Sequence, residues 1–150
     1  MVDTLTPQAR SALMARIGGK NTAPGILVRR LAHGLGYRFR LHRRDLPGSP
    51  DLVFPRLRKI VLVHGCYWHG HGCKIGRLPK SNVGFWADKI AKNRARDARN
   101  LADLRQLGWQ TLVVWQCETR RREALGKILE RFLGTHGKRR STRLRRMGRI

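Results

Sequence analysis

Acidic residues are scarce in this 150-residue chain: 9 Asp and Glu stand against 33 Lys and Arg, a formal net charge of +24. The last 13 residues hold seven of the positive charges and no acid, which leaves +17 for the rest. The basicity therefore belongs largely to the folded part. A polyanion is the expected partner, and nucleic acid is favoured over a membrane because no amphipathic anchor or lipidation signal is present. The alternative is a basic surface that serves only solubility, although small domains usually carry a much smaller net charge.

Long apolar runs are also missing. No segment reaches the roughly 18 apolar residues of a membrane-spanning helix, and the N-terminal segment lacks the apolar core of a signal peptide. Both absences predict a cytoplasmic protein without a membrane partner. Only three cysteines are present, so they cannot all form disulfides, and a reducing compartment favours metal ligation. The length fits a single domain, predicted over 1–134, with a basic disordered tail over 135–150.

Hydrophobic periodicity, turn residues and capping residues predict helices over about 6–17, 22–35, 83–107 and 122–133, and strands over 37–41, 51–54, 59–64 and 109–115. The first helix fits either a core element or an arm lying on DNA. The third is either one helix or two broken near Asn93. The first three strands have short links and predict an antiparallel meander, and the apolar run 109–115 predicts a central strand. The order predicts an α/β fold with helices on both sides of the sheet.

The stretch 64–73 concentrates three histidines, two cysteines, two aromatics and three glycines. Closely spaced glycines favour a tight loop. Three cysteines and one histidine form the ligand set of a closed, structural zinc site, with soft ligands that favour zinc over a hard cation: Cys66, His71, Cys73 and Cys117. This site requires Cys117 to lie beside Cys66, which adjacent strands would permit. The alternative is three unrelated buried cysteines.

Asp51, His64 and His69 remain outside that ligand set. A carboxylate suits Mg²⁺, which binds through few protein ligands and phosphate oxygens. A nearby histidine can take a proton from an attacking water. Metal-assisted phosphodiester hydrolysis is therefore a hypothesis. Considered alone, Asp51 is equally well explained as a capping residue, and each histidine as a structural residue. The hypothesis therefore rests on the occurrence of all three together.

Aromatic residues among basic ones can stack on bases or wedge between them. Tyr67, Trp68 and Trp86 fit that use, and they equally fit core packing. Trp109 and Trp115 flank an apolar strand and are assigned to the core.

Several motifs together resemble one known family. They are Leu46-Pro47-Gly48-x-Pro50-Asp51, the run from Val63 to Cys73, Phe85-Trp86-x-x-Lys89-Ile90-x-x-Asn93-x-x-Arg96-Asp97, Leu107-Gly108-Trp109 and Val114-Trp115-x-Cys117-Glu118. Over about residues 8–133 the chain resembles the very short patch repair (Vsr) DNA mismatch endonucleases. The resemblance implies a restriction-endonuclease-like fold of the PD-(D/E)XK type, with Pro50-Asp51 as its Pro-Asp signature.

The resemblance also implies an activity. Family members are bacterial enzymes that nick DNA on the 5′ side of the T in T:G mismatches left by deamination of 5-methylcytosine. We therefore expect a nucleoid-associated, cytoplasmic enzyme that acts on double-stranded DNA with a T:G mismatch. A monomer is expected because no obvious apolar association surface is left over.

Residue roles follow by matching positions. The resemblance implies a catalytic centre of Asp51, His64, His69 and Asp97, with His69 as general base and His64 assisting at the phosphate. It implies catalytic Mg²⁺ bound by Asp51 and the backbone carbonyl of Val63, and structural Zn²⁺ bound by Cys66, His71, Cys73 and Cys117. Intercalating aromatics match Tyr67, Trp68 and Trp86, and Met14 in the N-terminal helix reaches the minor groove.

Two positions depart from the family pattern. Val63 stands where the family usually has threonine, and a carbonyl ligand survives that change because every residue has one. Gly25 stands where the family has a glutamate that would join the outer coordination sphere of the metal. Gly25 favours an alternative, a zinc-stabilised protein that binds mismatched or distorted duplex with weak or lost nuclease activity. A basic RNA-binding module would leave Asp51 and His69 without a purpose.

Overall fold

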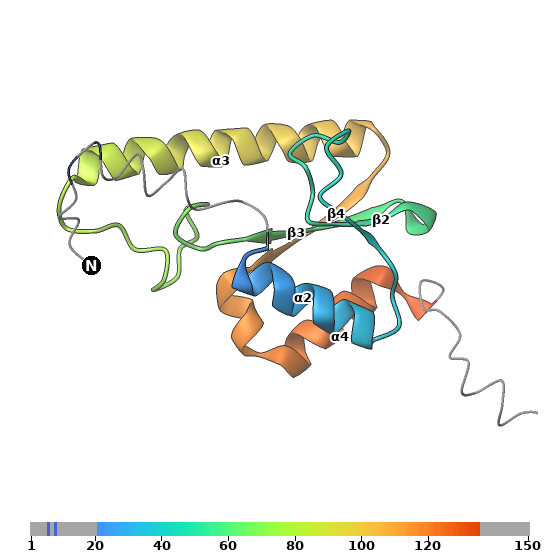
Figure 1. Cartoon of the computed structure of the whole chain (residues 1–150). Helices are drawn as coiled ribbons and strands as arrows, with labels where there is room; N and C mark the ends of the chain where they lie inside the picture. Colours follow the sequence, from blue (N-terminus) through green and yellow to red (C-terminus); the bar gives the residue numbers. More distant parts are fainter. Residues whose placement is uncertain (1–5, 7, 9–20, 136–150) are drawn as a thin grey trace, which may run out of the picture.

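The computed structural model describes residues 6, 8 and 21–135. A four-stranded sheet lies between helix α3 on one face and helices α2 and α4 on the other (Figure 1). The helices are α2 (Ala23–Gly34), α3 (Val83–Gln106) and α4 (Arg122–Leu133), and the strands are β1 (Arg40–Leu41), β2 (Leu52–Phe54), β3 (Lys59–His64) and β4 (Gln110–Trp115). Short 3-10 helices follow β2 (η1, Pro55–Leu57) and β4 (η2, Gln116–Arg120). The predicted N-terminal helix, apart from Thr6 and Gln8, lies outside the described residues, and so do Met14 and the predicted tail beyond Thr135.

The sheet is mixed, with the strand order β1-β2-β3-β4. β1, β2 and β3 pair antiparallel, which confirms the predicted meander, and β3 pairs with β4 in parallel. The prediction of 109–115 as a central strand is wrong, because within the described part of the chain β4 pairs only with β3 and forms an edge. Its apolar run has another cause: helices cover both faces of the sheet, so both sides of the strand are shielded.

The first predicted strand, 37–41, is also shorter than expected. Only Arg40 and Leu41 pair as a strand. Tyr37 is fully buried, and its hydroxyl donates a hydrogen bond to the carbonyl of Gly134 at 2.9 Å. Tyr37 and Phe39 both contact the ring of Phe54 edge-on. The alternation of apolar and basic residues therefore reflects aromatic packing rather than a long strand.

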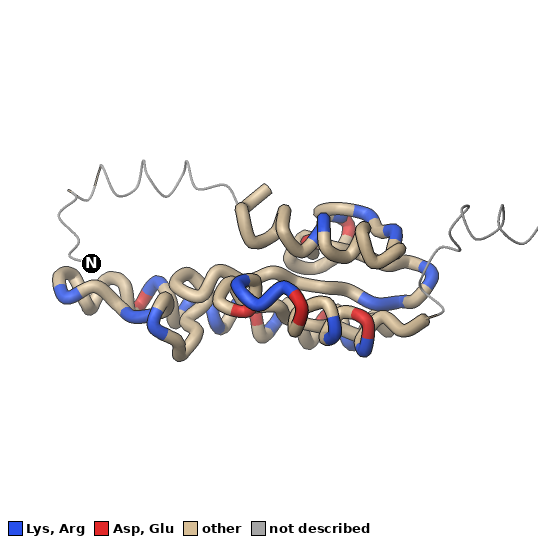
Figure 2. Tube along the Cα trace, turned by 90° about the horizontal axis from the view of Figure 1, so that it is seen from below, with Lys and Arg blue, Asp and Glu red and all other residues tan. Residues whose placement is uncertain are grey.

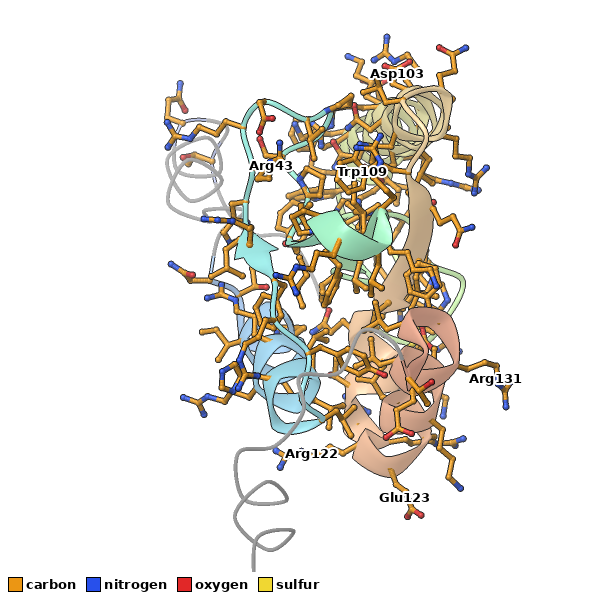
Figure 3. All side chains as sticks on the ribbon, turned by 90° about the vertical axis from the view of Figure 1, so that its right-hand side faces the viewer. Arg43, Asp103, Trp109, Arg122, Glu123 and Arg131 are labelled. Atoms are coloured by element: carbon orange, nitrogen blue, oxygen red, sulfur yellow. The ribbon has the colours of Figure 1, made fainter. Side chains whose placement is uncertain are left out.

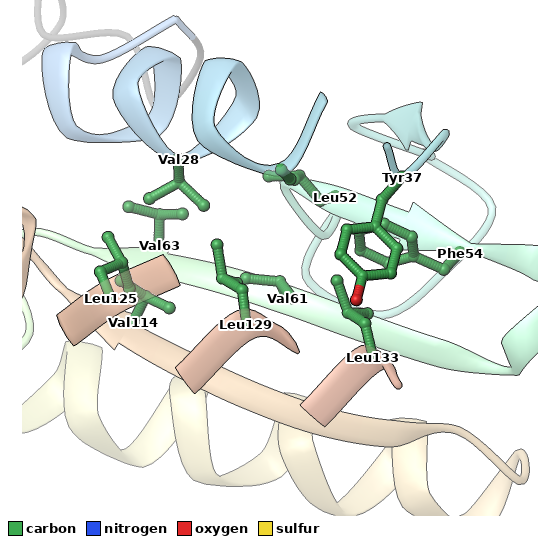
Figure 4. Packing of buried hydrophobic residues seen from close by; sticks show 11 residues of the cluster. Val28, Tyr37, Leu52, Phe54, Val61, Val63, Val114, Leu125, Leu129 and Leu133 are labelled. Atoms are coloured by element: carbon green, nitrogen blue, oxygen red, sulfur yellow. The ribbon is translucent and has the colours of Figure 1, made fainter. Parts of the chain in front are cut away.

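Two hydrophobic cores follow from the two-residue period of β3. Val61 and Val63 face α2 and α4, where they pack with residues such as Val28, Leu125 and Leu129 (Figure 4). Ile60 and Leu62 face α3 and pack with Val53, Leu104 and Trp109. In the side view, Trp109 lies between α3 and the sheet (Figure 3), which confirms its assignment to the core. By the same period His64 belongs to the α3 face.

α3 is one unbroken helix of 24 residues. Its buried positions are Trp86, Ile90, Asn93 and Leu104. Lysines and arginines are spread over the helices on both sides of the sheet, and fewer acidic residues lie among them (Figure 2). Among the described helices, none combines the length and apolar character that crossing a bilayer requires.

Candidate active site and metal centre

The parallel pairing of β3 with β4 assembles the cysteine cluster. His64 lies opposite Trp115 in the register, so Cys66 and Cys117 each follow two residues beyond the paired ends. The backbone amide of Cys117 donates a hydrogen bond to the sulfur of Cys66 at 3.3 Å. The predicted proximity of these two cysteines is confirmed.

Four side chains meet at this point. One ligand atom from each lies within 4.8 Å of the others: Cys66, His71, Cys73 and Cys117. The sulfur of Cys117 is 3.6 Å from Nδ1 of His71, and all three cysteines are free thiols. Gly76 packs so tightly that a Cβ atom there would lie 1.9 Å from the carbonyl oxygen of His71. Three sulfurs and one imidazole nitrogen suit a tetrahedral metal with soft ligands, so this cluster can hold a metal ion.

Proton affinities differ within the cluster. Burial raises the pKa of the Cys66 thiol to about 12. For Cys73, desolvation would raise the pKa, but hydrogen bonds with His71 and the amide of Gly76 outweigh it and lower the pKa to about 6. A metal ion must therefore displace a firmly held proton from Cys66, which makes metal binding dependent on pH.

A second site lies on the α3 side of the sheet. It is a cavity of about 380 Å³ between α3, the end of β3 and the turn before β2. Its lining residues are Gly48, Ser49, Asp51, Leu62, Val63, His64, His69, Arg96, Asp97, Asn100 and Leu101. All four predicted catalytic residues are therefore brought together, and their roles stay predictions.

Asp51 is fixed by the neighbouring strand. Its Oδ2 accepts a hydrogen bond from the backbone amide of Val63 at 2.8 Å, and its Oδ1 lies 4.0 Å from Nδ1 of His42. The amide and carbonyl of one residue in an extended strand point to the same side, so the carbonyl of Val63 also points to the side of β3 on which Asp51 lies. Burial raises the pKa of Asp51, against the lowering effects of the Val63 amide and of His42. A carboxylate and a carbonyl are hard oxygen ligands of the kind that suit Mg²⁺.

His69 and Asp97 form a close pair. Nδ1 of His69 lies 2.5 Å from Oδ2 of Asp97, which comes from α3. An ionised carboxylate only accepts hydrogen bonds, so Nδ1 is the donor to an ionised Asp97, and Nε2 is the ring nitrogen outside this contact. The contact therefore orients the ring and leaves Nε2 able to take up a proton.

His64 lies directly against His69. The two rings stack with centroids 4.0 Å apart and planes 6° apart. Burial is the main cause that lowers the pKa of His64 to about 4; the nearby His69 adds to this, and Asp97 opposes it. At neutral pH His64 is therefore uncharged. A metal ion bound by two imidazoles must lie near the plane of each ring, and nearly parallel planes share no such point. Although His64, His69 and Asp97 lie close enough to form a metal-binding group, this arrangement favours proton transfer over shared metal ligation.

Trp115 connects the two sites. It is half-buried rather than a core residue, so its assignment to the core needs correction. Its ring stacks on His71 with centroids 4.3 Å apart and meets His64 edge-on at 5.3 Å. The parallel register causes this, because it places Trp115 beside His64 on the α3 face. One indole therefore separates the cysteine cluster from the cavity.

The three predicted DNA-contacting aromatics form one group. Tyr67, Trp68 and Trp86 contact one another edge-on, with centroids 5.1–5.9 Å apart. Trp86 is buried, while Tyr67 and Trp68 are partly exposed. Phe85 is 45% exposed and packs edge-on against Trp86. An aromatic surface therefore lies at the N-terminal end of α3. Its residues pack against one another, and Tyr67 and Trp68 are also partly exposed.

Several residues near the cavity had no role assigned from sequence. Buried Asn93 donates a hydrogen bond from Nδ2 to the carbonyl of Trp68 at 2.8 Å and accepts one from Arg96 at 3.2 Å. Arg96 and Asn100 line the cavity, and His42 lies beside Asp51. For Asn93 and Asn100 a signal existed: they and Asp97 interrupt the apolar stripe of α3 at helical spacing.

Comparisons with known proteins identify relatives over most of this chain. A family model described as DNA mismatch endonuclease Vsr matches residues 2–75. Type II nicking enzyme V.XorIIP of Xanthomonas oryzae pv. oryzae is 58% identical over 118 residues, which cover 79% of this chain and 87% of the relative. DNA mismatch endonuclease Vsr of Escherichia coli is 39% identical over 125 residues, which cover 83% and 80%. The chain belongs to the Vsr family.

Membership of the Vsr family confirms the resemblance drawn from the motifs. Type II nicking enzyme V.NmeAIP of Neisseria meningitidis, 38% identical over 133 residues, covers 89% of this chain, so the similarity extends well beyond residue 75. The names of these Vsr relatives support a DNA endonuclease, and the mixed sheet with flanking helices is compatible with an α/β nuclease fold.

Cys117→Ser tests the cysteine cluster. Because it removes one of four clustered ligands, we expect the purified variant to lose its bound metal and its Tm to fall by about 10 °C or more. Elemental analysis and thermal unfolding measure both effects. Thr119→Val is the control, since it removes only a hydrogen bond to the carbonyl of Gln116 within η2. A Cys117→Ser protein that keeps its metal and its stability would contradict the four-ligand site.

Stability in acid tests the burial of His64. Its pKa falls from 6.5 to about 4 on folding, so between these values the unfolded state binds more protons and the unfolding free energy decreases as the pH is lowered. Denaturant unfolding at a series of pH values should show a shallower decrease for His64→Gln than for wild type. The exposed His33→Gln should keep the wild-type slope. Equal slopes for all three proteins would contradict a buried, neutral His64.

Proposed function

We propose that this protein nicks double-stranded DNA on the 5′ side of the T in T:G mismatches that arise from deamination of 5-methylcytosine. The reaction is hydrolysis of one phosphodiester bond with His69 as general base. One observation carries the proposal: a single cavity contains Asp51, backed by the Val63 amide, together with the hydrogen-bonded pair His69 and Asp97. Membership of the Vsr family supports it.

Asp51 and Val63 would hold Mg²⁺ through a carboxylate and a carbonyl oxygen. When bound, Mg²⁺ neutralises negative charge on the phosphate as the transition state forms. The hydrogen bond from the Val63 amide fixes the carboxylate before substrate arrives, so its orientation costs little during the reaction.

Proton transfer falls to the histidines. A water molecule attacks phosphorus, its proton passes to Nε2 of His69, and the P–O bond to the leaving oxygen breaks as that oxygen takes up a proton from solvent. Asp97 stabilises the imidazolium that forms on His69, as an orienting carboxylate does in other general-base pairs. Uncharged His64 can donate one N–H to the phosphate without adding charge.

We assign Zn²⁺ to the cysteine cluster, as a structural ion. A closed four-ligand site leaves no open position for substrate, so its use is to hold the fold. Two of its ligands, Cys66 and His71, bracket the segment that carries Tyr67, Trp68 and His69. The ion would therefore keep the general base and the aromatic group at a fixed spacing.

Tyr67, Trp68 and Trp86 are assigned to intercalation beside the mismatch, with Met14 in the minor groove. The partial exposure of Tyr67 and Trp68 and the surrounding positive charge support contact with a base stack, while buried Trp86 packs against both. A restriction-endonuclease-like fold, a monomeric state, a nuclease domain over 1–134 with a basic tail, and a cytoplasmic, nucleoid-associated location in bacteria complete the proposal.

Gly25 favours a second candidate, a protein that binds mismatched or distorted duplex but cuts it weakly or not at all. Gly25 is buried in the first turn of α2, and its amide donates to the hydroxyl of Thr22. Glycine supplies no side-chain oxygen near the metal. The two candidates differ in catalysis and share DNA binding.

A duplex with a single T:G mismatch separates them. In the presence of Mg²⁺ we expect one nick, 5′ of the T, seen on a denaturing gel with each strand labelled in turn. Asp51→Asn should abolish the nick and leave DNA binding, while exposed Asp103→Asn should cut like wild type. Binding without a nick by the wild-type protein would favour the second candidate, and cutting by Asp51→Asn would refute the metal assignment.

Asp51→Asn should also leave the Tm in Mg²⁺-free buffer equal to or above that of wild type. The folded-state pKa of Asp51 is raised above its ordinary 3.8, so its ionisation costs stability as the pH rises through this window, and neutral Asn avoids the cost. A lowered Tm would mean that the loss of nicking reflects damage to the fold.

Gly25→Glu tests the departure from the family pattern. The new carboxylate should lower the Mg²⁺ concentration needed for half-maximal nicking, while Gly25→Gln, of equal size and no charge, should not. A Cβ at this position lies 3.0 Å from the Thr22 hydroxyl, which must shift slightly. Equal Mg²⁺ requirements for Gly25→Glu and wild type would show that this position does not influence the metal.

A further inference from the structure

We propose that Arg96 is the phosphate-binding residue of the cavity and contacts a non-bridging oxygen of the scissile phosphate through its guanidinium group. The inference rests on the proposed nuclease function and deepens it. The first observation is the distribution of charge in the cavity lining. Among the described residues that line the cavity, Arg96 is the only lysine or arginine, and it shares the lining with two carboxylates, Asp51 and Asp97.

A phosphodiester brings negative charge into a site that already holds two acids. Without Arg96, the side chains of this cavity would repel the substrate at close range. The basic exterior cannot replace a local cation, because charges separated by more than about 8 Å of solvent are largely screened at physiological ionic strength. Arg96 is the cation that the described lining itself supplies to offset this charge.

The geometry of Arg96 suits this use. Within the part of the chain that the structure describes, its guanidinium forms no ion pair within 4.0 Å and has one hydrogen bond, from Nη2 to Oδ1 of Asn93 at 3.2 Å. A guanidinium carries five N–H donors in a planar fork, so donors remain for a phosphate. The side chain is exposed while it lines the cavity, which keeps it accessible to DNA.

Asn93 fixes the orientation of the Arg96 side chain through their hydrogen bond. Asn93 is 6% exposed and is itself held by its hydrogen bond to the carbonyl of Trp68. It lies one helical turn before Arg96, so the guanidinium is oriented from inside the protein. Asp97 follows Arg96 and holds His69. Successive residues of α3 thus present a phosphate-binding cation and orient the general base.

The test compares Arg96→Ala with Arg99→Ala. Arg99 lies on the same helix, is exposed and does not line the cavity, so both variants lose one positive charge from α3. Under single-turnover conditions on the T:G duplex we expect Arg96→Ala to cut on the order of 10²–10³ times more slowly. Arg99→Ala should stay near the wild-type rate, and Arg96→Lys, which keeps the charge and loses the fork, should fall between.

Binding to a modified duplex gives a second measurement that needs no cutting. A neutral methylphosphonate replaces the phosphate 5′ of the mismatched T, and affinity is measured without Mg²⁺. Wild type and Arg99→Ala should bind this duplex about tenfold more weakly than the unmodified one. For Arg96→Ala the two duplexes should bind equally, because the contact is already lost.

The outcomes separate this inference from the proposed function. A full methylphosphonate penalty in Arg96→Ala overturns the role of Arg96, whether or not the protein cuts. Wild-type protein that binds but does not nick overturns the enzyme proposal, and the methylphosphonate comparison still decides the contact. Wild-type protein that shows no preference for T:G duplex over matched duplex overturns both.

Discussion

The parallel pairing of β3 with β4, in one register, is the constraint on which both sites depend. It places His64 opposite Trp115 and thereby brings together Cys66 and Cys117, which are 51 positions apart in the chain. Parallel strands end at the same edge of the sheet, so the loop after β3 and η2 after β4 start side by side. A shift of one residue would turn His64 to the α2 and α4 face and separate the two cysteines. The cysteine cluster and the cavity are therefore two consequences of a single register.

α3 provides the second constraint, because it holds the loop 65–82 at consecutive points. Asn93 bonds the carbonyl of Trp68, and Asp97, one turn later, bonds the ring of His69. Close packing leaves little freedom between them: a Cβ at Gly70, where φ is +68°, would lie 2.7 Å from side-chain atoms of both Ile90 and Arg94. In the proposed function this arrangement links the aromatic residue that enters the base stack to the neighbouring general base, through one rigid helix.

Local chemistry was enough to predict some of this structure. The Thr22 cap and Pro24 define the start of α2, and α4 has the predicted bounds. The sequence also predicts the proximity of Cys66 and Cys117, because it indicates adjacent strands before each of them. Three-dimensional packing decided the rest. Apolar residues on both sides of β4 suggested a central strand, although helices rather than strands shield it. The carbonyl of Val63 is invisible to composition, since every residue has one, and only the resemblance singled it out. Arg96 looks like one basic residue among many in the sequence, and only the cavity shows that it shares a lining with the carboxylates.

The contrast between a basic exterior and an acidic cavity explains how these parts can work together. A net charge of +24 acts over long distances and draws a polyanion to the surface, although salt weakens it. Asp51 and Asp97 act only at close range, and their contacts differ. Asp97 is hydrogen-bonded to His69, so Asp51 is the carboxylate that remains available for a cation. With Gly25 in place of an acid, no further carboxylate comes from the start of α2. Mg²⁺ is commonly bound by one or two carboxylates together with phosphate oxygens of the substrate. In the proposed function, a cavity with one available carboxylate would therefore bind Mg²⁺ together with a phosphate oxygen of the DNA.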